Sequence, residues 1–212
     1  MAEMMGVVAP SPEAGSKPAQ ILEAAGKLFL ENGYGAVSMD AVAKTANVSK
    51  ATLYAHFRSK DELFAAMVAC ECRNQMGTLS CEQVSRLDVA DALRLIGRRF
   101  MLMLLSSKAL AAYRVVVAEA HRFPELARAF YESGPAHSHA QMAAYLRDVD
   151  RRGVLRIPDA DLAAEQFFGL LKVQIHTRFI LCIDPQLPES EIERVVNAAV
   201  DLFTKGYAPD PR

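Results

Sequence analysis

The sequence predicts an all-α protein, and three observations support this fold class. Apolar residues recur at helical spacing along nearly the whole chain after residue 16. No run alternates apolar and polar residues as a half-buried strand does, and the β-branched cluster at residues 115–117 lies inside a helical pattern. Four prolines fall where helical patterns begin or end, positions at which proline is tolerated: Pro124, Pro135, Pro158 and Pro188.

The N-terminal quarter predicts a leader and four helices. Residues 1–16 are rich in Ala, Pro, Gly and Ser, which indicates a flexible leader. A first helix then buries one apolar face and ends at Gly33. Ser38 and Ser49 can cap a second and a third short helix, the third ending near His56. The pair Ser59 and Glu62 has the spacing of a capping box and predicts the start of a fourth, longer helix.

The remainder predicts six more helices, at about 88–105, 107–121, 124–132, 136–152, 159–182 and 188–206. The helix at 159–182 is apolar around most of its circumference, so it needs burial on two sides. A partner subunit can supply the second side, and so can a central position in a monomer. The last helix carries one apolar stripe.

Composition excludes several classes of protein. The 212 residues are 51% hydrophobic and 23% charged with a net charge of −1, which is typical of a globular protein of one or two domains. No apolar run reaches the ~18 residues of a membrane span, and no signal peptide is evident, so we expect a cytoplasmic protein with no membrane partner. Its cysteines are then expected as reduced thiols. Metal-ligand spacing is absent, so no metal or other cofactor is expected.

The segment at residues 38–60 carries the functional pattern. Two short helices joined by a tight turn at Asn47 form a helix-turn-helix, in which the second helix enters the major groove of DNA. Four cations and no acid lie between residues 42 and 60, as expected of a surface that binds phosphate. Two alternatives remain open, a small all-α enzyme and a protein-binding scaffold. The enzyme lacks nucleotide-binding, zinc-protease and serine-hydrolase motifs, and the scaffold leaves the cationic patch without a role.

Residues 20–69 resemble the DNA-binding domain of the TetR family of transcriptional regulators. The resemblance rests on these positions: Ala24, Ala25, Leu28, Phe29, Gly33, Tyr34, Ala43, Ala46, Val48, Leu53, Tyr54, Phe57, Lys60, Leu63 and Phe64. It implies a DNA-binding domain at 17–75 and a regulatory and dimerisation domain at 76–212. The candidate DNA-binding residues are Ser38, Lys44, Ser49, Lys50, Ala51, Thr52, Tyr54, His56 and Lys60. The leader carries only Lys17, so minor-groove contacts from a basic arm are not expected.

Residues 113–135 are similar to the C-terminal domain of the AefR-like branch of that family. This implies a non-enzymatic, homodimeric regulator, most simply a repressor, that leaves a pseudo-palindromic operator in double-stranded DNA when a small hydrophobic effector binds. The candidate ligand-binding residues are Met101, Leu104, Tyr113, Val117, Phe130, Phe167, Leu171, Gln174 and His176. The candidate dimer-interface residues are Phe168, Ile175, Phe179, Ile192, Val196, Ala199 and Phe203. The sequence leaves the effector, the operator and the choice between repressor and activator open.

Overall fold

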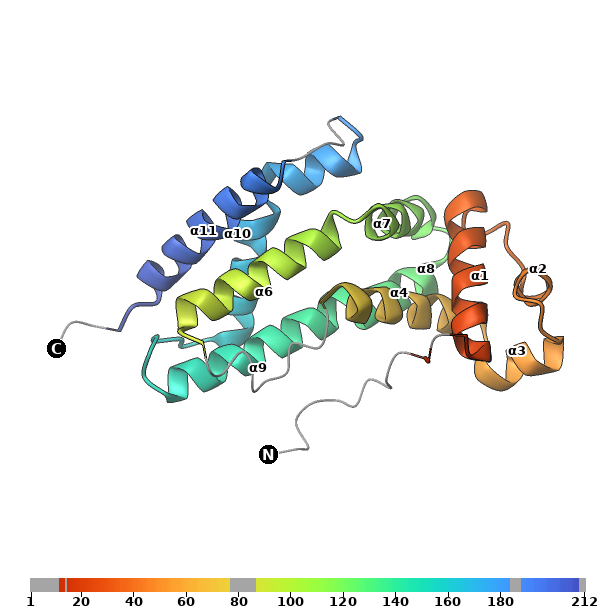
Figure 1. The fold of residues 1–212 in the computed structure, drawn as a ribbon, viewed down its shortest axis with the longest axis horizontal. Helices are drawn as coiled ribbons and strands as arrows, with labels where there is room; N and C mark the ends of the chain where they lie inside the picture. The colour runs from red at the N-terminus through yellow and green to blue at the C-terminus, as the bar shows by residue number, and fades with distance from the viewer. Residues whose placement is uncertain (1–11, 14, 77–86, 184–187, 210–212) are drawn as a thin grey trace. The chain divides into compact units, whose positions relative to one another are not determined.

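The computed structural model describes residues 12–13, 15–76, 87–183 and 188–209, and every regular element among them is a helix (Figure 1). The elements are α1 (Lys17–Asn32), α2 (Met39–Thr45), α3 (Lys50–His56), α4 (Lys60–Met76), α6 (Val89–Leu104), α7 (Ser107–Glu119), α8 (Pro124–Tyr131), η1 (Glu132–Ala136), α9 (His137–Arg151), α10 (Ala160–Ile180) and α11 (Glu189–Gly206). The predicted all-α fold is confirmed, and the predicted helices match the observed ones to within about two residues. Most of the predicted leader lies outside the described residues, although Ser16 caps α1.

The chain forms two compact units. The first combines the chain up to Asn74 with Ser107–Ala136, and the second combines Gln75–Ser106 with His137–Arg212. Unit 1 therefore contains α7, α8 and the π-helical turn η1 in addition to the helix-turn-helix, because α7 packs on α1. The sequence-based expectation is two domains that each form one continuous stretch, divided at residue 75. Each of the two compact units instead combines two separate stretches of the chain.

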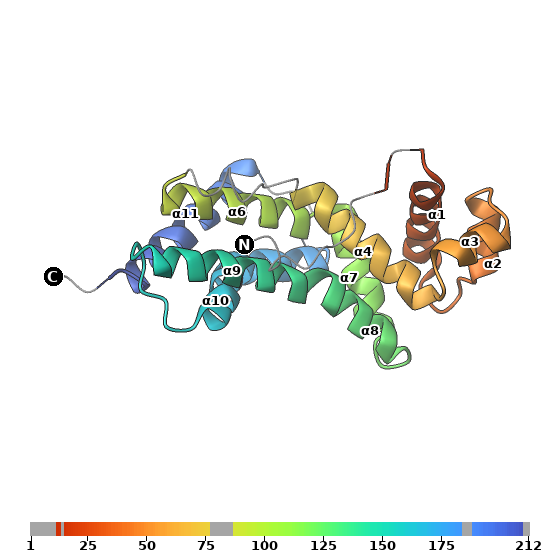
Figure 2. The same ribbon diagram turned by 90° about the horizontal axis from the view of Figure 1, so that it is seen from below.

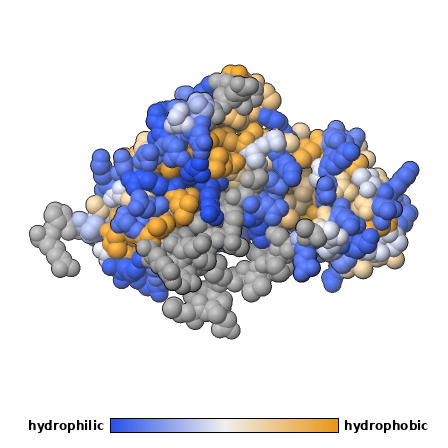
Figure 3. Space-filling model, viewed as in Figure 1, coloured by the Kyte–Doolittle hydropathy of each residue, from blue (hydrophilic) through white to orange (hydrophobic). Residues whose placement is uncertain are grey.

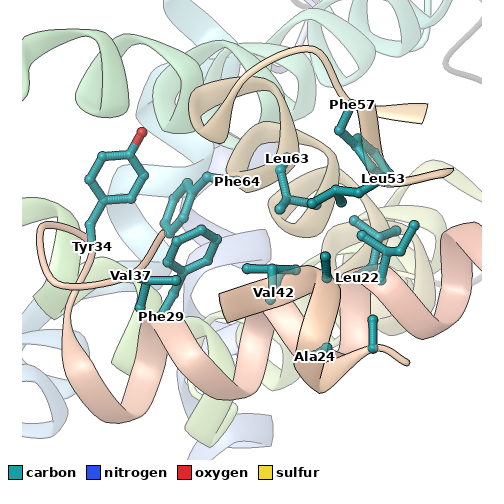
Figure 4. Packing of buried hydrophobic residues seen from close by; sticks show 14 of the residues in the cluster. Leu22, Ala24, Phe29, Tyr34, Val37, Val42, Leu53, Phe57, Leu63 and Phe64 are labelled. Carbon is teal, nitrogen blue, oxygen red and sulfur yellow. The ribbon is translucent and has the colours of Figure 1, made fainter. Parts of the chain in front are cut away.

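The core of unit 1 holds the helix-turn-helix together. Figure 4 shows the rings of Phe29, Tyr34 and Phe64 grouped at one end of the buried cluster, with Leu53 and Phe57 at the other. The centroids of the three rings are 5.5 to 5.8 Å apart, a spacing typical of favourable aromatic contacts. Since this cluster joins α1, the α1–α2 loop and α4 to α3, it fixes the orientation of the two short helices.

The core of unit 2 is built around α10, which packs against α9, α6 and α11; Figures 1 and 2 show α6 running beside α11. Phe168 lies 4.3 Å from Phe100 between ring centroids, and Phe167 lies 5.3 Å from Phe203. Gly97 allows α6 to approach closely, because a Cβ atom there would lie 3.3 Å from Val196 and 3.4 Å from a methyl group of α10. The apolar surface of α10 is thus largely used within the chain.

No single helix among the described residues has the length and apolar composition needed to cross a membrane. The consecutive helices α6 and α7 reach that length and composition only as a pair, and the pair is bent by 63°.

Candidate nucleic-acid interface

The two short helices begin as the sequence predicts. The Ser38 side chain accepts a hydrogen bond from the backbone N–H of Ala41 (3.2 Å), and Ser49 accepts one from Thr52 (3.0 Å). Each serine has extended backbone torsions and satisfies one of the free N–H groups at the start of its helix. Asn47 between the helices has a φ of 52°, a left-handed conformation that asparagine tolerates. These local features set the angle at which α3 leaves α2.

The outward face of α3 presents side chains suited to a DNA groove. Lys50, Ala51, Tyr54 and His56 are exposed, and 48% of the Tyr54 surface is accessible although the side chain is large. Thr52 is half-buried, and its hydroxyl oxygen lies 2.8 Å from the Ser49 hydroxyl. Ser38, which caps α2, and Lys44 on α2 are exposed as well. Leu53 is fully buried on the opposite side of α3, so burial of one face dictates which residues face outward.

Asp40, an acid that sequence reasoning did not select, lies beside this surface. Its carboxylate accepts a hydrogen bond from the Lys50 ammonium at 2.5 Å, and both side chains are more than half exposed. Residues 40 and 50 belong to different helices, and only the packing of α2 on α3 brings them together. The sequence could have drawn attention to Asp40, because it is the one acidic residue between residues 38 and 60.

Lys60 lies in a different environment from the other candidate DNA ligands. Its ammonium donates hydrogen bonds to the carbonyl oxygens of Tyr34 (2.9 Å) and Val37 (3.0 Å), and it lies 4.2 Å from the centroid of the Tyr34 ring. Burial lowers the pKa of Lys60, while the carboxylates of Asp61 and Glu119 act in the opposite direction. The predicted phosphate contact from Lys60 stays a prediction, and the structure gives this residue a second role in holding the α1–α2 loop.

Residues outside the helix-turn-helix hold the same loop. The Glu119 carboxylate at the end of α7 accepts a hydrogen bond from the backbone N–H of Gly35 (3.3 Å). Phe123 packs edge-on against Tyr34, with ring centroids 5.3 Å apart. The Tyr34 hydroxyl donates to Asp61 at 2.5 Å, and burial together with this contact raises the pKa of Tyr34. The corner between α7 and α8 therefore fixes the loop that precedes Ser38.

The predicted ligand-binding residues divide between the two units. Tyr113 and Phe130 lie in unit 1 with ring centroids 6.2 Å apart, and Val117 in the same unit is 62% exposed. The other six belong to unit 2, where Met101, Phe167 and Leu171 are fully buried, Leu104 and His176 half-buried and Gln174 exposed. Burial and the neighbouring Lys172 lower the pKa of His176. Their role in ligand binding stays a prediction.

The predicted dimer-interface residues lie mainly in the core of one chain. Phe168, Ile175 and the four candidates on α11 are all buried within unit 2, and Phe179 is half-buried. The exposed surface of the same two helices carries other apolar side chains, including Leu162 on α10 and Leu202 on α11. Figure 3 shows that hydrophobic patches lie between hydrophilic ones on the face of the molecule in view.

A shallow cleft of about 350 Å³ lies in unit 1 between the start of α4 and α8. It contains none of the predicted ligand-binding residues and is lined by Ser59, Asp61, Glu62, Ala65, Glu125, Arg128, Ala129, Glu132 and Ser133. Across the described part of the chain, no three His, Cys, Asp or Glu side chains are grouped so that they could hold a metal ion.

Two family models match the chain. Residues 21–67 match the model of bacterial regulatory proteins of the TetR family, and residues 91–209 match the C-terminal domain of AefR-like transcriptional repressors. The HTH-type transcriptional regulator YhgD of Bacillus subtilis is 59% identical over 44 residues, which are 21% of this chain and 23% of YhgD. The chain thus spans about a quarter of the length of the curated relatives it matches.

Solved structures match nearly the whole chain. The flavonoid-responsive regulator FrrA is 38% identical, with 93% of this chain and 100% of FrrA covered and a TM-score of 0.77. A TetR-family regulator from Mesorhizobium loti is 28% identical, with 91% and 97% covered and a TM-score of 0.78. On the helix-turn-helix geometry, the two family models and these full-length matches, the chain belongs to the TetR family of transcriptional regulators, which bind DNA and are not enzymes.

Proposed function

We propose that this protein is a ligand-responsive repressor that binds a pseudo-palindromic operator as a homodimer in the cytoplasm. The DNA-binding step is supported by the exposed face of α3. Lys50, Tyr54 and His56 on this helix are exposed, and Leu53 is its one buried residue. Lysine can donate to guanine or phosphate, and the tyrosine hydroxyl can donate to a phosphate oxygen. Ser38, Lys44 and Ser49 flank this face and would contact the DNA backbone.

TetR-family regulators act as dimers, and the exposed side of α10 and α11 supports a specific interface. The apolar side chains of Leu162 and Leu202 are 48% and 59% exposed there, and the small residues Gly169 and Ala198 leave room for close helix packing. A side chain that the chain itself buries has little surface left for a partner, so we place the interface on these exposed residues rather than on Phe168 or Val196. Leu202→Asp should convert the dimer to monomers in light scattering, whereas Leu87→Asp, at an exposed leucine outside these helices, should not.

The proposed effector is a small hydrophobic, aromatic compound. FrrA is flavonoid-responsive by name and shares 38% identity over almost the full length, and the AefR-like family model describes repressors. The aromatic and methionine side chains proposed to contact the effector suit such a compound. Release from DNA requires the effector to bind the DNA-incompetent conformation more tightly than the competent one.

The DNA-binding step is tested by selecting binding sites from random duplex DNA with the full chain. We expect an inverted repeat, with affinity that falls steeply as salt rises, because phosphate contacts release counterions. Tyr54→Ala should weaken binding to the selected site at least tenfold without changing the unfolding midpoint. Tyr131→Ala, at an exposed tyrosine on α8, is the matched control. Selection of no sequence, or equal affinity of the Tyr54 variant, would contradict the proposal.

The regulatory step is tested by adding a panel of flavonoids to the preformed complex with the selected DNA. Release of DNA by an aromatic compound, with a matching rise in the unfolding midpoint of the free protein, is the expected result. The Tyr54 variant should show the same rise, because it retains the effector site. Retention of DNA at saturating effector would contradict release as the mechanism.

A further inference from the structure

The ion pair between Asp40 and Lys50 has no evident role in stability. Its Nζ–Oδ2 distance is 2.5 Å, but the side chains are 66% exposed for Lys50 and 58% for Asp40. Exposed ion pairs between single side chains contribute little to the free energy of folding. An acid beside a phosphate-binding surface also weakens binding to DNA through repulsion. The position of Asp40 in the first turn of α2 favours that helix, but it does not require the contact with Lys50, so we look for the role of the ion pair in recognition.

We infer that Asp40 and Lys50 act together to recognise one guanine–cytosine base pair in each half of the operator. This inference rests on the proposed use of α3 as the helix that enters the major groove. Lys50 would donate to the guanine, and Asp40 would accept from the cytosine. Asp40 is then a specificity-determining residue. Its carboxylate also holds the Lys50 ammonium in place, so that Lys50 is less available to bind a phosphate of unrelated DNA.

The pattern of donors and acceptors supports this pairing. In the major groove, guanine offers two neighbouring acceptors, N7 and O6, and cytosine offers the N4 amino donor. Guanine O6 and cytosine N4 are themselves joined by a hydrogen bond, so they lie about 2.9 Å apart. The Lys50 ammonium donates only and the Asp40 carboxylate accepts only, and their 2.5 Å separation is close to that spacing.

Other base pairs fit this arrangement less well. With adenine–thymine in the same orientation, the ammonium meets the N6 amino donor and the carboxylate meets the O4 acceptor. With cytosine–guanine, the ammonium meets the N4 donor and the carboxylate meets O6. Thymine–adenine offers the ammonium the O4 acceptor and the carboxylate the N6 amino donor, so both contacts can form, but it lacks the second acceptor of guanine and places a methyl group beside the ammonium. Desolvation in the groove makes each mismatched contact costly, so the preference for guanine–cytosine over adenine–thymine and cytosine–guanine should be about tenfold or more per half-site, and the preference over thymine–adenine should be smaller.

Asp40 should also reduce binding to unrelated DNA. On such DNA, Lys50 can serve only as a phosphate ligand, and the neighbouring carboxylate competes with phosphate for its ammonium. Removing the carboxylate would free one cation per subunit. Each additional phosphate contact steepens the dependence of log affinity on log salt by about 0.9, so a dimer should gain about 1.8.

The experiment uses the full chain, the selected operator and duplexes in which each base pair is replaced symmetrically in both halves. Asp40→Ala removes both charge and acceptor, and Asp40→Asn removes the charge while keeping an acceptor oxygen. Glu23→Gln, at an exposed acid on α1, is the matched control for net charge. We expect the unaltered chain to prefer guanine–cytosine over adenine–thymine and cytosine–guanine at one symmetric position, and Asp40→Ala to reduce that preference to less than about threefold.

The same titrations on unrelated DNA test the second effect. Both Asp40 variants should bind such DNA more tightly than the unaltered chain and with the steeper salt dependence, whereas Glu23→Gln should not. Unchanged base preferences and an unchanged salt slope in both Asp40 variants would overturn the inference. If Lys50→Ala and Tyr54→Ala also bind the operator as well as the unaltered chain, the proposed use of α3 fails with it. If only those two variants lose affinity, the use of α3 stands and the role of Asp40 is refuted.

Discussion

Replacing Lys60 by methionine separates a structural role from a DNA-binding role. The ammonium of Lys60 donates to the carbonyl oxygens of Tyr34 and Val37 at 2.9 and 3.0 Å. Methionine has similar length and apolar bulk but donates nothing, so both carbonyl oxygens lose a charged donor. The Tyr34 carbonyl also accepts from the Val37 N–H at 3.4 Å, which leaves the Val37 carbonyl as the more affected group.

The magnitude follows from these contacts. A hydrogen bond from a charged donor contributes about 1.5 to 3 kcal/mol, and the cation–π contact with Tyr34 adds about 0.5 to 1 kcal/mol at a partly exposed site. Because one of the two carbonyl oxygens keeps a partner and solvent reaches part of the site, we expect a loss of about 2 kcal/mol in the free energy of unfolding. For a chain of this length that is a fall of about 4 to 8 °C in Tm.

Urea unfolding followed by circular dichroism measures this loss, with Lys27→Met as the control. Lys27 is an exposed lysine on α1, so its replacement removes the same charge without the two carbonyl contacts, and we expect a change within about 0.5 kcal/mol. Equal stability of the Lys60 and Lys27 variants, combined with loss of operator affinity only for Lys60→Met, would refute the structural role. It would restore Lys60 as a simple phosphate ligand.

Two further predictions concern packing and pH. Gly97→Val should lower the free energy of unfolding by about 1 to 3 kcal/mol in urea titrations, because a Cβ atom there already lies 3.3 Å from Val196 and the added methyl groups have no space; unchanged stability would show that α6 can move away. Burial raises the pKa of the Cys72 thiol to about 11 from an ordinary value of 9.0. The unfolded chain therefore releases this proton at lower pH than the folded chain, and stability falls as pH rises from about 9 to about 11. Cys72→Ala should reduce the loss between pH 7.5 and 10.5 by about 2 kcal/mol, and an identical pH profile would contradict this.

Local capping explains why the helices could be predicted from the sequence. Ser38 and Ser49 stand where a side-chain oxygen reaches the free N–H three residues later, and Gly33 adopts a φ of 80° that other residues avoid. These features depend on neighbours within a few residues. The outward direction of Tyr54 could also be predicted, because the neighbouring Leu53 must face the core and consecutive residues of a helix point in different directions.

The features that sequence reasoning missed depend on distant contacts. Asp40 meets Lys50 only after α2 packs on α3, and Lys60 contacts carbonyl oxygens more than twenty residues earlier in the chain. The apolar stripe that contains Val196 predicts burial but does not say whether the chain or a partner provides it. The association of α7 with α1 in unit 1 likewise leaves no local pattern.

In the proposed complex, α3 of each subunit contacts the major groove in successive half-sites, and methylation interference on the selected operator tests this mode of binding most directly. Dimethyl sulfate marks guanine N7 in the major groove and adenine N3 in the minor groove. We expect guanine methylation to block binding in two symmetric clusters whose centres lie about one helical turn, or 34–36 Å, apart or a multiple of it. Interference confined to adenine N3, or a single unpaired cluster of guanines, would contradict both the groove assignment and the dimeric mode of binding.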